Sequence, residues 1–487
     1  MPFPPSAKFP RKSLSLSQGP SILGDKLSTT FPVEIRVEIF RHCCAFFPID
    51  APFGARGAGP LKLIRVSRSW RDLVLNTPTL WASFSLWVTA AQTNSRLVVA
   101  LAQCLTRSRG AGLSFIFRYP VLDATCTKLF AQLLAASDRW REVTLNAPSA
   151  SLLSLWDFVG LGRNGGSFPA LRSLSVETVG LAPASVRSLS VSWAQLTKLD
   201  LFLIAFPTLD DCLFVLQQAV NLLSCSLNAA CILEEEAPHV TLSKVADLKL
   251  RLYDGHGTPS LSEDSFHAFL ECIECPNMRS FGLKWNLSHG PARLSHTDKL
   301  ITFLDRQSAH LERLQLSYIP LDTPQLVRVL ESVPGLRELR LAHSTIDREG
   351  DFINDRFLEA LADGASTRLP LLESVAFNST GECFSNPALL RFIASRWKHR
   401  PITPGSLQHL EINSPKRVAE YTPHWFRDWK EAKLDVRASL KRSPADMLNV
   451  LPAFLAKDLD SYETVCFMNC DFPLDIRSLL AFDVLPK

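Results

Sequence analysis

Two short stretches, Leu311-Glu-Arg-Leu-Gln-Leu316 and Leu336-Arg-Glu-Leu-Arg-Leu341, decide the fold of this chain. Each stretch places leucine at positions i, i+3 and i+5. Successive side chains of an extended strand point to opposite faces, so the last two leucines of each stretch share one face and the residue between them lies on the other. Each stretch therefore predicts a short strand with one apolar and one polar face.

The same apolar spacing recurs along most of the chain. Its eleven copies cover residues 140–145, 171–176, 196–201, 222–227, 245–250, 278–283, 311–316, 336–341, 372–377, 407–412 and 462–467. An extra copy starts at Val186. Successive copies of the eleven start 23 to 36 residues apart, except for 55 residues before the last one. Most of these spacings bracket the period of a leucine-rich repeat, with insertions in some copies.

Segments with helical periodicity lie between the predicted strands, for example residues 209–218, 266–273 and 325–331. Alternation of strand and helix at this period stacks parallel strands through right-handed crossovers, with helices on one side of the sheet and a concave surface on the other. The repeats therefore predict an α/β fold, namely an irregular leucine-rich-repeat solenoid with a parallel concave sheet and outer helices.

A different apolar pattern precedes the repeats. It consists of Phe31-Pro-Val-Glu-Ile-Arg-Val-Glu-Ile-Phe40, Leu63-Ile-Arg-Val-Ser-Arg-Ser-Trp-Arg-Asp72 and Pro78-Thr-Leu-Trp81. Pro32 suits the first turn of a helix, where its missing N–H costs nothing. The first stretch is apolar on more than one side, so its helix must be buried on two fronts. Ser67 is the predicted N-cap of a second helix that presents Trp70 toward the first.

The order and spacing of these three stretches resemble the F-box, in the variant common among basidiomycete-type fungal F-box-like proteins. In that family a three-helix domain docks on the Skp adaptor subunit of a cullin-RING ubiquitin ligase, and the rest of the chain selects a substrate. The resemblance implies that adaptor-binding residues lie in the first stretch, with supporting residues in the other two. The implied adaptor-contacting residues are Pro32, Ile35, Ile39 and Phe40, and the supporting residues are Val66, Trp70, Leu80 and Trp81.

This sequence departs from the family pattern in two places. Phe31 stands where leucine is usual, and residues 47–60 form a Pro- and Gly-rich insertion between the first and second helices. Such an insertion is tolerable because the entropy of closing a loop grows slowly with its length. The leucine-rich repeats also resemble the C-terminal region of the same fungal proteins, notably at Thr208-Leu-Asp-Asp-Cys-Leu213 and Asn221-Leu-Leu223.

The expected domain organisation follows from these two resemblances. We expect a disordered leader at residues 1–25, an F-box-like three-helix domain at 26–90, a helical linker or solenoid cap at 91–139, and the solenoid at 140–487. The implied partners are the Skp adaptor, the cullin scaffold and an unidentified protein substrate. The implied location is the cytoplasm, the nucleus or both.

Composition argues against several other classes of protein. The chain of 487 residues has a net charge of +4, with only 21% charged residues, so no nucleic-acid partner is expected. No apolar run approaches the length of a membrane-spanning helix, so no membrane partner is expected. The 12 cysteines are scattered singly through apolar positions, which favours a reducing compartment over a disulfide scaffold.

Recognisable catalytic chemistry is missing from the sequence. No phosphate-binding loop, nucleophile elbow or zinc-protease motif is present, so we expect no enzymatic activity, cofactor or metal site in the chain itself. The C-x-x-C pair Cys272 and Cys275 lacks a second pair, and we expect it to end a helix, with Pro276 marking the stop.

Three functional hypotheses remain. The leading one is a substrate receptor of an SCF-type ubiquitin ligase. The second is a leucine-rich-repeat interaction scaffold whose helical N-terminus only caps the first repeat. The third is an enzyme that uses Cys272 and Cys275 as a thiol-disulfide centre. For the first hypothesis, a basic strip suited to a phosphorylated peptide has to be weighed against ordinary solvated positions; its residues are Arg251, Lys284, Arg313 and Arg340.

Overall fold

The computed structural model describes most of the chain between residues 31 and 439. The described ranges are 31–49, 59–87, 95–118, 123–148, 168–179, 191–206, 208–233, 238–253, 259–286, 294–307, 309–343, 351–363, 368–379, 383–396, 407–413 and 435–439. The predicted leader at 1–25 lies outside these residues. None of the described helices is long and apolar enough to cross a membrane.

The described strands form one 14-stranded parallel sheet whose strand order follows the chain. Its strands are β1 (Phe47–Pro48), β2 (Ser83–Trp87), β3 (Leu113–Arg118), β4 (Trp140–Pro148), β5 (Ser173–Val179), β6 (Lys198–Phe206), β7 (Ser224–Ala230), β9 (Asp247–Tyr253), β11 (Ser280–Asn286), β12 (Arg313–Ser317), β13 (Glu338–Ala342), β14 (Ser374–Asn378), β15 (His409–Asn413) and β16 (Asp435–Ser439). Two further short strands, β8 (Val240–Thr241) and β10 (Ile273–Glu274), pair with each other outside this sheet.

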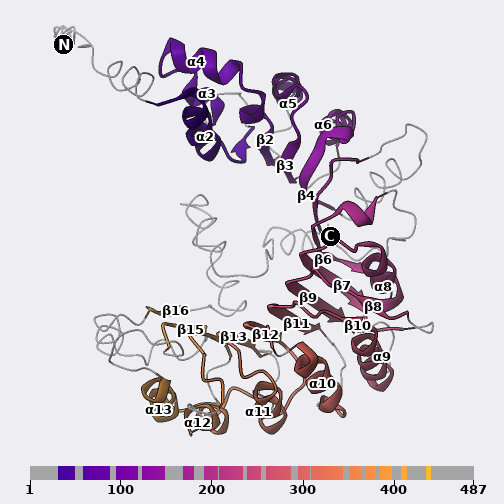
Figure 1. Cartoon of the computed structure of the whole chain (residues 1–487), viewed down its shortest axis with the longest axis vertical. Helices are drawn as coiled ribbons and strands as arrows, with labels where there is room; N and C mark the ends of the chain where they lie inside the picture. Colours follow the sequence, from indigo (N-terminus) through magenta and orange to yellow (C-terminus); the bar gives the residue numbers. More distant parts are fainter. Residues whose placement is uncertain are drawn as a thin grey trace, which may run out of the picture.

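Figure 1 shows the strands along the inner side of an open arc and the helices on its outer side. The outer helices are α5 (Ser95–Ser108), α6 (Ala124–Leu134), α8 (Leu209–Gln218), α9 (Pro259–Cys272), α10 (Thr297–Gln307), α11 (Thr323–Glu331), α12 (Asp355–Asp363) and α13 (Asn386–Arg396). The predicted α/β class, with a large parallel sheet in a solenoid-like arrangement, is confirmed at this level.

The leucine spacing sets the register of the sheet. Leu314 pairs with Leu339, and Leu316 pairs with Leu341, on neighbouring strands β12 and β13. All four side chains are almost completely buried. Ten of the eleven predicted copies coincide with strands β4 to β7, β9 and β11 to β15. The copy at 462–467 and the extra copy at Val186 lie outside the described residues.

Most strands of the repeats are also joined to their predecessor at the turn that enters them. The Glu312 carbonyl accepts the N–H groups of both Arg337 and Glu338, at 2.8 and 2.9 Å. The Arg337 carbonyl accepts the N–H groups of Glu373 and Ser374 in the same way, at 2.8 and 2.9 Å. This repeated contact gives a hydrogen-bond acceptor to backbone N–H groups that would otherwise be buried without one at the turn.

The sheet begins earlier than the predicted start of the solenoid at residue 140. Strands β1, β2 and β3 precede that residue and pair in parallel with one another and with β4. Residues 91–139, expected as a helical linker or cap, therefore contain a strand as well as the two outer helices α5 and α6.

Buried aromatic rings continue the core across this N-terminal part of the sheet. The Phe84 and Phe115 rings stack with their centroids 5.7 Å apart, and the Phe115 and Trp140 centroids are 5.2 Å apart. Trp140 in turn contacts Phe168, at 5.1 Å. One hydrophobic core therefore runs from the N-terminal helices into the repeats.

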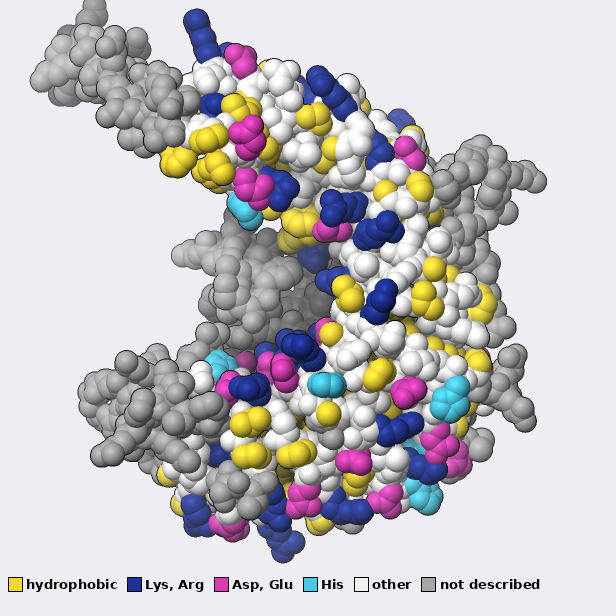
Figure 2. Space-filling view, viewed as in Figure 1, with side chains coloured by type: hydrophobic (Ala, Val, Ile, Leu, Met, Phe, Trp, Pro, Cys, Tyr) yellow, Lys and Arg dark blue, Asp and Glu magenta, His cyan; other side chains and the backbone are white. Residues whose placement is uncertain are grey.

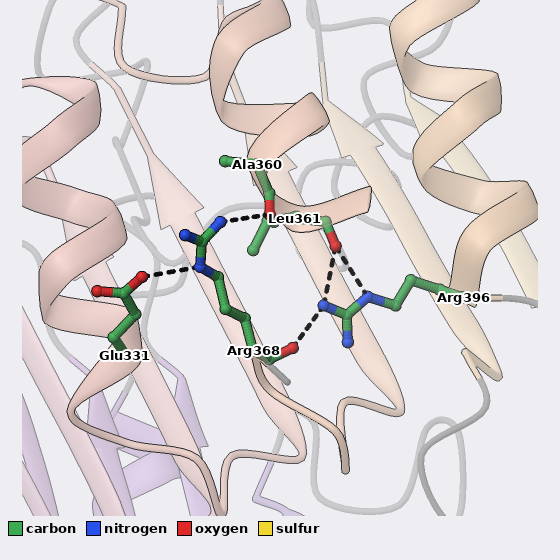
Figure 3. Close-up of polar contacts among 5 residues, drawn as sticks. All are labelled: Glu331, Ala360, Leu361, Arg368 and Arg396. Atoms are coloured by element: carbon green, nitrogen blue, oxygen red, sulfur yellow. Dashed lines mark hydrogen bonds and ion pairs between the residues drawn. The ribbon is translucent and has the colours of Figure 1, made fainter. Parts of the chain in front are cut away.

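Two arginines tie the outer helices together near the C-terminal end of the described chain (Figure 3). The Arg396 side chain is buried and donates to the carbonyls of Leu361, Arg368 and Leu369. The Arg368 side chain donates to Glu331 and to the Ala360 carbonyl. These bonds join α11, α12 and α13 through the loop that follows α12.

Candidate partner-docking surface on the N-terminal helices

Helix α2 (Val33–Cys43) forms most of the first predicted motif. Pro32 is its N-cap, one residue before the first helical residue, and its carbonyl accepts the Arg36 N–H at 3.1 Å. Glu34 lies in the first turn and Arg41 in the last turn, so both charges complement the helix dipole. The charged residues at both ends of α2 therefore favour the helix that the sequence predicts.

The second and third motifs form α3 (Pro60–Leu63), α4 (Arg68–Leu75) and the short 3-10 helix η1 (Pro78–Trp81). The predicted N-cap is confirmed, because the Ser67 Oγ accepts the Trp70 N–H at 3.2 Å. Helix α4 packs on α2 through Trp70, whose ring centroid lies 4.5 Å from that of Phe40. The three stretches thus form one small helical unit.

Four of the eight predicted site residues lie in or against the core. Phe40, Leu80 and Trp81 are at most 3% exposed, and Trp70 is partly buried. The Trp81 Nε1 donates to the Val74 carbonyl at 2.9 Å, and the Arg107 guanidinium lies 4.4 Å from the centre of its ring. These four side chains support the helical unit from inside.

The other four predicted residues, Pro32, Ile35, Ile39 and Val66, face solvent. Ile35 and Ile39 are 48% and 44% exposed, and their spacing of four residues places them on one face of α2, away from Phe40. Phe31 and Val33 are also exposed large apolar residues at the start of this helix. We call Phe31, Val33, Ile35 and Ile39 the α2 apolar surface; Figure 2 shows hydrophobic side chains gathered there, beside the point where the described chain begins.

The sequence motif missed part of this surface. Phe31 is a departure from the family pattern and Val33 is not among the implied adaptor-contacting residues, yet their side chains are 40% and 47% exposed. The signal was the excess of apolar residues around α2, since one buried face accounts for only some of them. The interpretation that a second face needs a partner applies to these residues too.

Both ends of the predicted insertion at residues 47–60 are held by the fold. Phe47 and Pro48 form β1 at the edge of the sheet, where the Ile49 N–H donates to the Ser85 carbonyl at 2.8 Å. Pro60 starts α3. Gly59 has a φ of +56°, and a Cβ at this position would lie 2.4 Å from the Phe47 Cβ. Residues 50–58 lie outside the described part of the chain.

The C-x-x-C pair lies where α9 ends, and its surroundings disfavour the thiolate form of both cysteines. Helix α9 ends at Cys272, before the expected stop at Pro276, because Ile273 and Glu274 form β10. Burial raises the pKa of the Cys275 thiol to about 12 and also raises the pKa of Cys272, which opposes the thiolate that redox chemistry needs. In the described ranges, no group of three or more His, Cys, Asp or Glu side chains is arranged to hold a metal ion.

Comparisons with known proteins leave the family open. No protein-family model matches the chain, and no curated protein matches it. One similar solved structure is that of a structural-genomics target from Bacteroides fragilis, which is 9% identical over 67% of this chain and 75% of the other, with a TM-score of 0.32. A likeness this distant says nothing about function.

Proposed function

We propose that this chain is the substrate-recognition subunit of a cullin-RING ubiquitin ligase of the SCF type. The N-terminal helices bind the Skp adaptor, which joins the chain to the cullin scaffold, and the solenoid binds a protein substrate. The observation that carries the proposal is the division of the F-box-like motif, in which half of the predicted residues build the helical unit and half face outward. The proposal places the chain in the cytoplasm, the nucleus or both, where these partners work.

The α2 apolar surface has the character of a docking site. Exposed apolar side chains grouped at one place mark interaction sites more often than those scattered singly. Burial of the exposed half of an isoleucine side chain stabilises a complex by about 1 kcal/mol. Ile35 and Ile39 together with Phe31 and Val33 therefore supply several kcal/mol, and the buried Phe40 and Trp70 hold the helix that presents them.

The chain needs no catalytic group for this role. A receptor accelerates ubiquitin transfer by holding the substrate close to a charged conjugating enzyme, and positioning alone contributes several kcal/mol to lowering a barrier. The covalent chemistry belongs to the partner enzymes. Cofactor and metal are not required of this chain.

One observation favours the alternative of a repeat scaffold without a ligase role. Trp81 occupies the position in its repeat that Trp140 occupies two strands later, since Phe84 aligns with Phe115 and Phe115 with Val143. Each indole donates to the carbonyl seven residues earlier, Val74 for Trp81 and Leu133 for Trp140, at 2.9 Å in both. The end of the F-box-like motif thus also serves as the first repeat, as a solenoid cap would.

Copurification separates the two functions. The wild-type chain should retain the Skp adaptor, and the double variant Ile35→Asp, Ile39→Asp should lose it while keeping its melting temperature, because both side chains face solvent. Val220→Asp is the matched control, since Val220 is 53% exposed far along the repeats. A folded wild-type chain that does not retain the adaptor would reject the ligase proposal and leave the scaffold.

A further inference from the structure

The turns that lead into the strands of the main sheet follow one another along one rim of the arc. In each turn from β5 to β15, a backbone N–H group donates to the carbonyl of the equivalent residue one strand earlier, as Arg172 does to Arg141 at 2.8 Å. Neighbouring strands lie about 4.8 Å apart, so these equivalent residues form a closely spaced row. In chain order the row consists of Arg141, Arg172, Thr197, Leu223, Ala246, Arg279, Glu312, Arg337, Glu373 and Gln408.

Charges in the later part of the row balance one another. The four charged residues there alternate in sign, from Arg279 and Glu312 to Arg337 and Glu373. The Arg337 Nη1 donates to the Glu373 Oε1 at 2.7 Å, so one neighbouring pair also forms an ion pair. This part of the rim therefore has little charge left for a partner.

The row begins differently, with two arginines side by side. Arg141 and Arg172 occupy adjacent places, and both side chains are exposed. Two more arginines lie in the same turns. A Cβ at Gly112 would lie 3.6 Å from the Arg141 Cδ and 3.8 Å from the Arg139 carbonyl, and Arg109 comes three residues before this glycine. We call Arg109, Arg139, Arg141 and Arg172 the rim arginine cluster.

One half of the cluster is tied to the fold and the other half is not. Arg139 donates to the Ser108 Oγ and Arg172 donates to a backbone carbonyl, both at 3.2 Å. Arg109 and Arg141 are exposed, and their side chains form no hydrogen bond or ion pair with the described part of the chain. The first two arginines therefore hold fixed positions, and the last two offer free donors beside them.

The basic strip that the sequence suggested on the sheet is more fully used by the fold. The Lys284 ammonium lies 4.9 Å from the centre of the Tyr318 ring, and the Arg340 Nε donates to the Glu338 Oε1 at 2.6 Å. Both cations thus stabilise neighbouring side chains. The rim arginine cluster is the better candidate for a charged interaction surface.

Acidic side chains offset the cluster only in part. Asp138 precedes Arg139 and Glu142 follows Arg141, so two of the four arginines have no acid next to them along the chain. The described residues from 31 to 148 carry thirteen Lys or Arg and six Asp or Glu, whereas those from 168 to 439 carry eighteen and twenty-two. Figure 1 shows β3 and β4 between the N-terminal helices and the rest of the arc. The cluster therefore adds to a positive field over the N-terminal part of the molecule.

An acidic polypeptide fits this cluster better than a small anion does. The four arginines are spread over the turns that enter β3, β4 and β5, so one small anion contacts only some of them. Successive acidic residues of an extended segment are about 3.3 Å apart along the chain, and arginine binds carboxylates through two parallel hydrogen bonds. The described residues of these turns include no exposed aromatic side chain on which the bases of a single-stranded nucleic acid could stack.

We infer that the rim arginine cluster binds an acidic segment of a partner protein, one that presents several Asp or Glu side chains in succession. Arg139 and Arg172 contribute guanidinium groups that are already fixed, which reduces the side-chain entropy lost on binding. Arg109 and Arg141 turn toward the bound carboxylates. The inference goes beyond the proposed function, because it applies equally to a ligase receptor and to a repeat scaffold.

The test is a binding titration of the full chain with a fluorescent octaglutamate peptide at low salt. We expect saturable binding, and roughly fivefold weaker binding by the double variant Arg109→Gln, Arg141→Gln, since two exposed ion pairs contribute on this scale. The matched control is Lys128→Gln on α6 combined with Arg356→Gln on α12, which removes the same charge away from the cluster. All four side chains are exposed, so both variants should keep the melting temperature of the wild-type chain.

Three outcomes would overturn the inference. They are the absence of saturable octaglutamate binding by the wild-type chain, equal binding by the cluster variant and the matched control, and tighter binding of a single-stranded oligonucleotide than of octaglutamate. The titration contains no adaptor, and the cluster variant should still copurify with the Skp adaptor. Failure of this inference is therefore distinguishable from failure of the ligase proposal, which the α2 variants test.

Discussion

At the scale of single residues, burial separates two roles that one sequence motif had combined. The motif named eight residues without saying which would face the core and which a partner. Trp81 is completely buried, whereas Ile35 is 48% exposed. The sequence could not divide them, since apolar residues on every side of α2 and two large tryptophans fit either role.

A glycine at the edge of the helical unit gives the sharpest test at this scale. Gly59 has a left-handed φ of +56°, and a Cβ added there would lie 2.4 Å from the Phe47 Cβ. The alanine of Gly59→Ala would therefore strain the backbone and clash with the Phe47 side chain. We expect a loss of roughly 2 kcal/mol or more in the free energy of unfolding. Gly110→Ala is the control, since a Cβ there meets nothing within 4 Å. Denaturant unfolding followed by circular dichroism measures both, and equal stabilities of the two variants would contradict the expectation.

At the scale of elements, most strands could be predicted because their apolar spacing is complete. The strands that were missed show what the spacing cannot detect. In β3, Phe115 and Phe117 occupy the two inward positions, but Gly112 stands where the leading leucine is expected. In β16, Lys433 stands at that place. Pairing with the neighbouring parallel strands therefore stabilises β3 and β16 as strands, although their own apolar spacing does not predict them.

Strand β2 was missed for a different reason. Trp81, Phe84 and Leu86 fit the repeat spacing in full, but Trp81 had been assigned to the helical motif. The paired Phe84–Phe115 and Leu86–Phe117 positions show that it begins a repeat as well. Trp81 therefore belongs both to the helical motif and to a repeat, and only the strand pairing of β2 shows its place in the repeat.

The outer helices depend on a buried arginine whose role no sequence pattern predicts. The Arg396 guanidinium donates to the Leu361, Arg368 and Leu369 carbonyls at 3.0, 2.7 and 2.6 Å. Arg396→Met removes the guanidinium that donates to these carbonyls, of which Leu369 keeps a backbone donor, the Leu372 N–H, and we expect a loss of roughly 3 kcal/mol or more. Arg391→Met on the same helix removes only the exposed pair with Glu359 and should cost less than about 1 kcal/mol. Thermal unfolding of the two variants compares them, and an Arg391 variant as unstable as the Arg396 variant would exclude this role.

At the scale of the whole molecule, the N-terminal helices and the solenoid form one continuous body. The predicted boundary near residue 90 follows β2, which is already part of the parallel sheet. Trp81 contacts Phe47 on one side and Arg107 on the other. In the proposed ligase, this shared core fixes the distance between the α2 apolar surface and the solenoid, so substrate is held at a set position relative to the adaptor.

This continuity predicts that the F-box-like segment does not fold alone. A fragment of residues 26–90 keeps the helices but loses β3, the Phe115 ring against Phe84 and the Arg107 guanidinium over Trp81. A fragment of residues 26–148 restores all three and contains three successive repeat strands, about the minimum for a stable array. We expect cooperative thermal unfolding and dispersed amide resonances for the longer fragment only. Cooperative unfolding of the shorter fragment in isolation would show an independent domain, and the geometry between the adaptor and the substrate would then depend on a joint instead of a shared core.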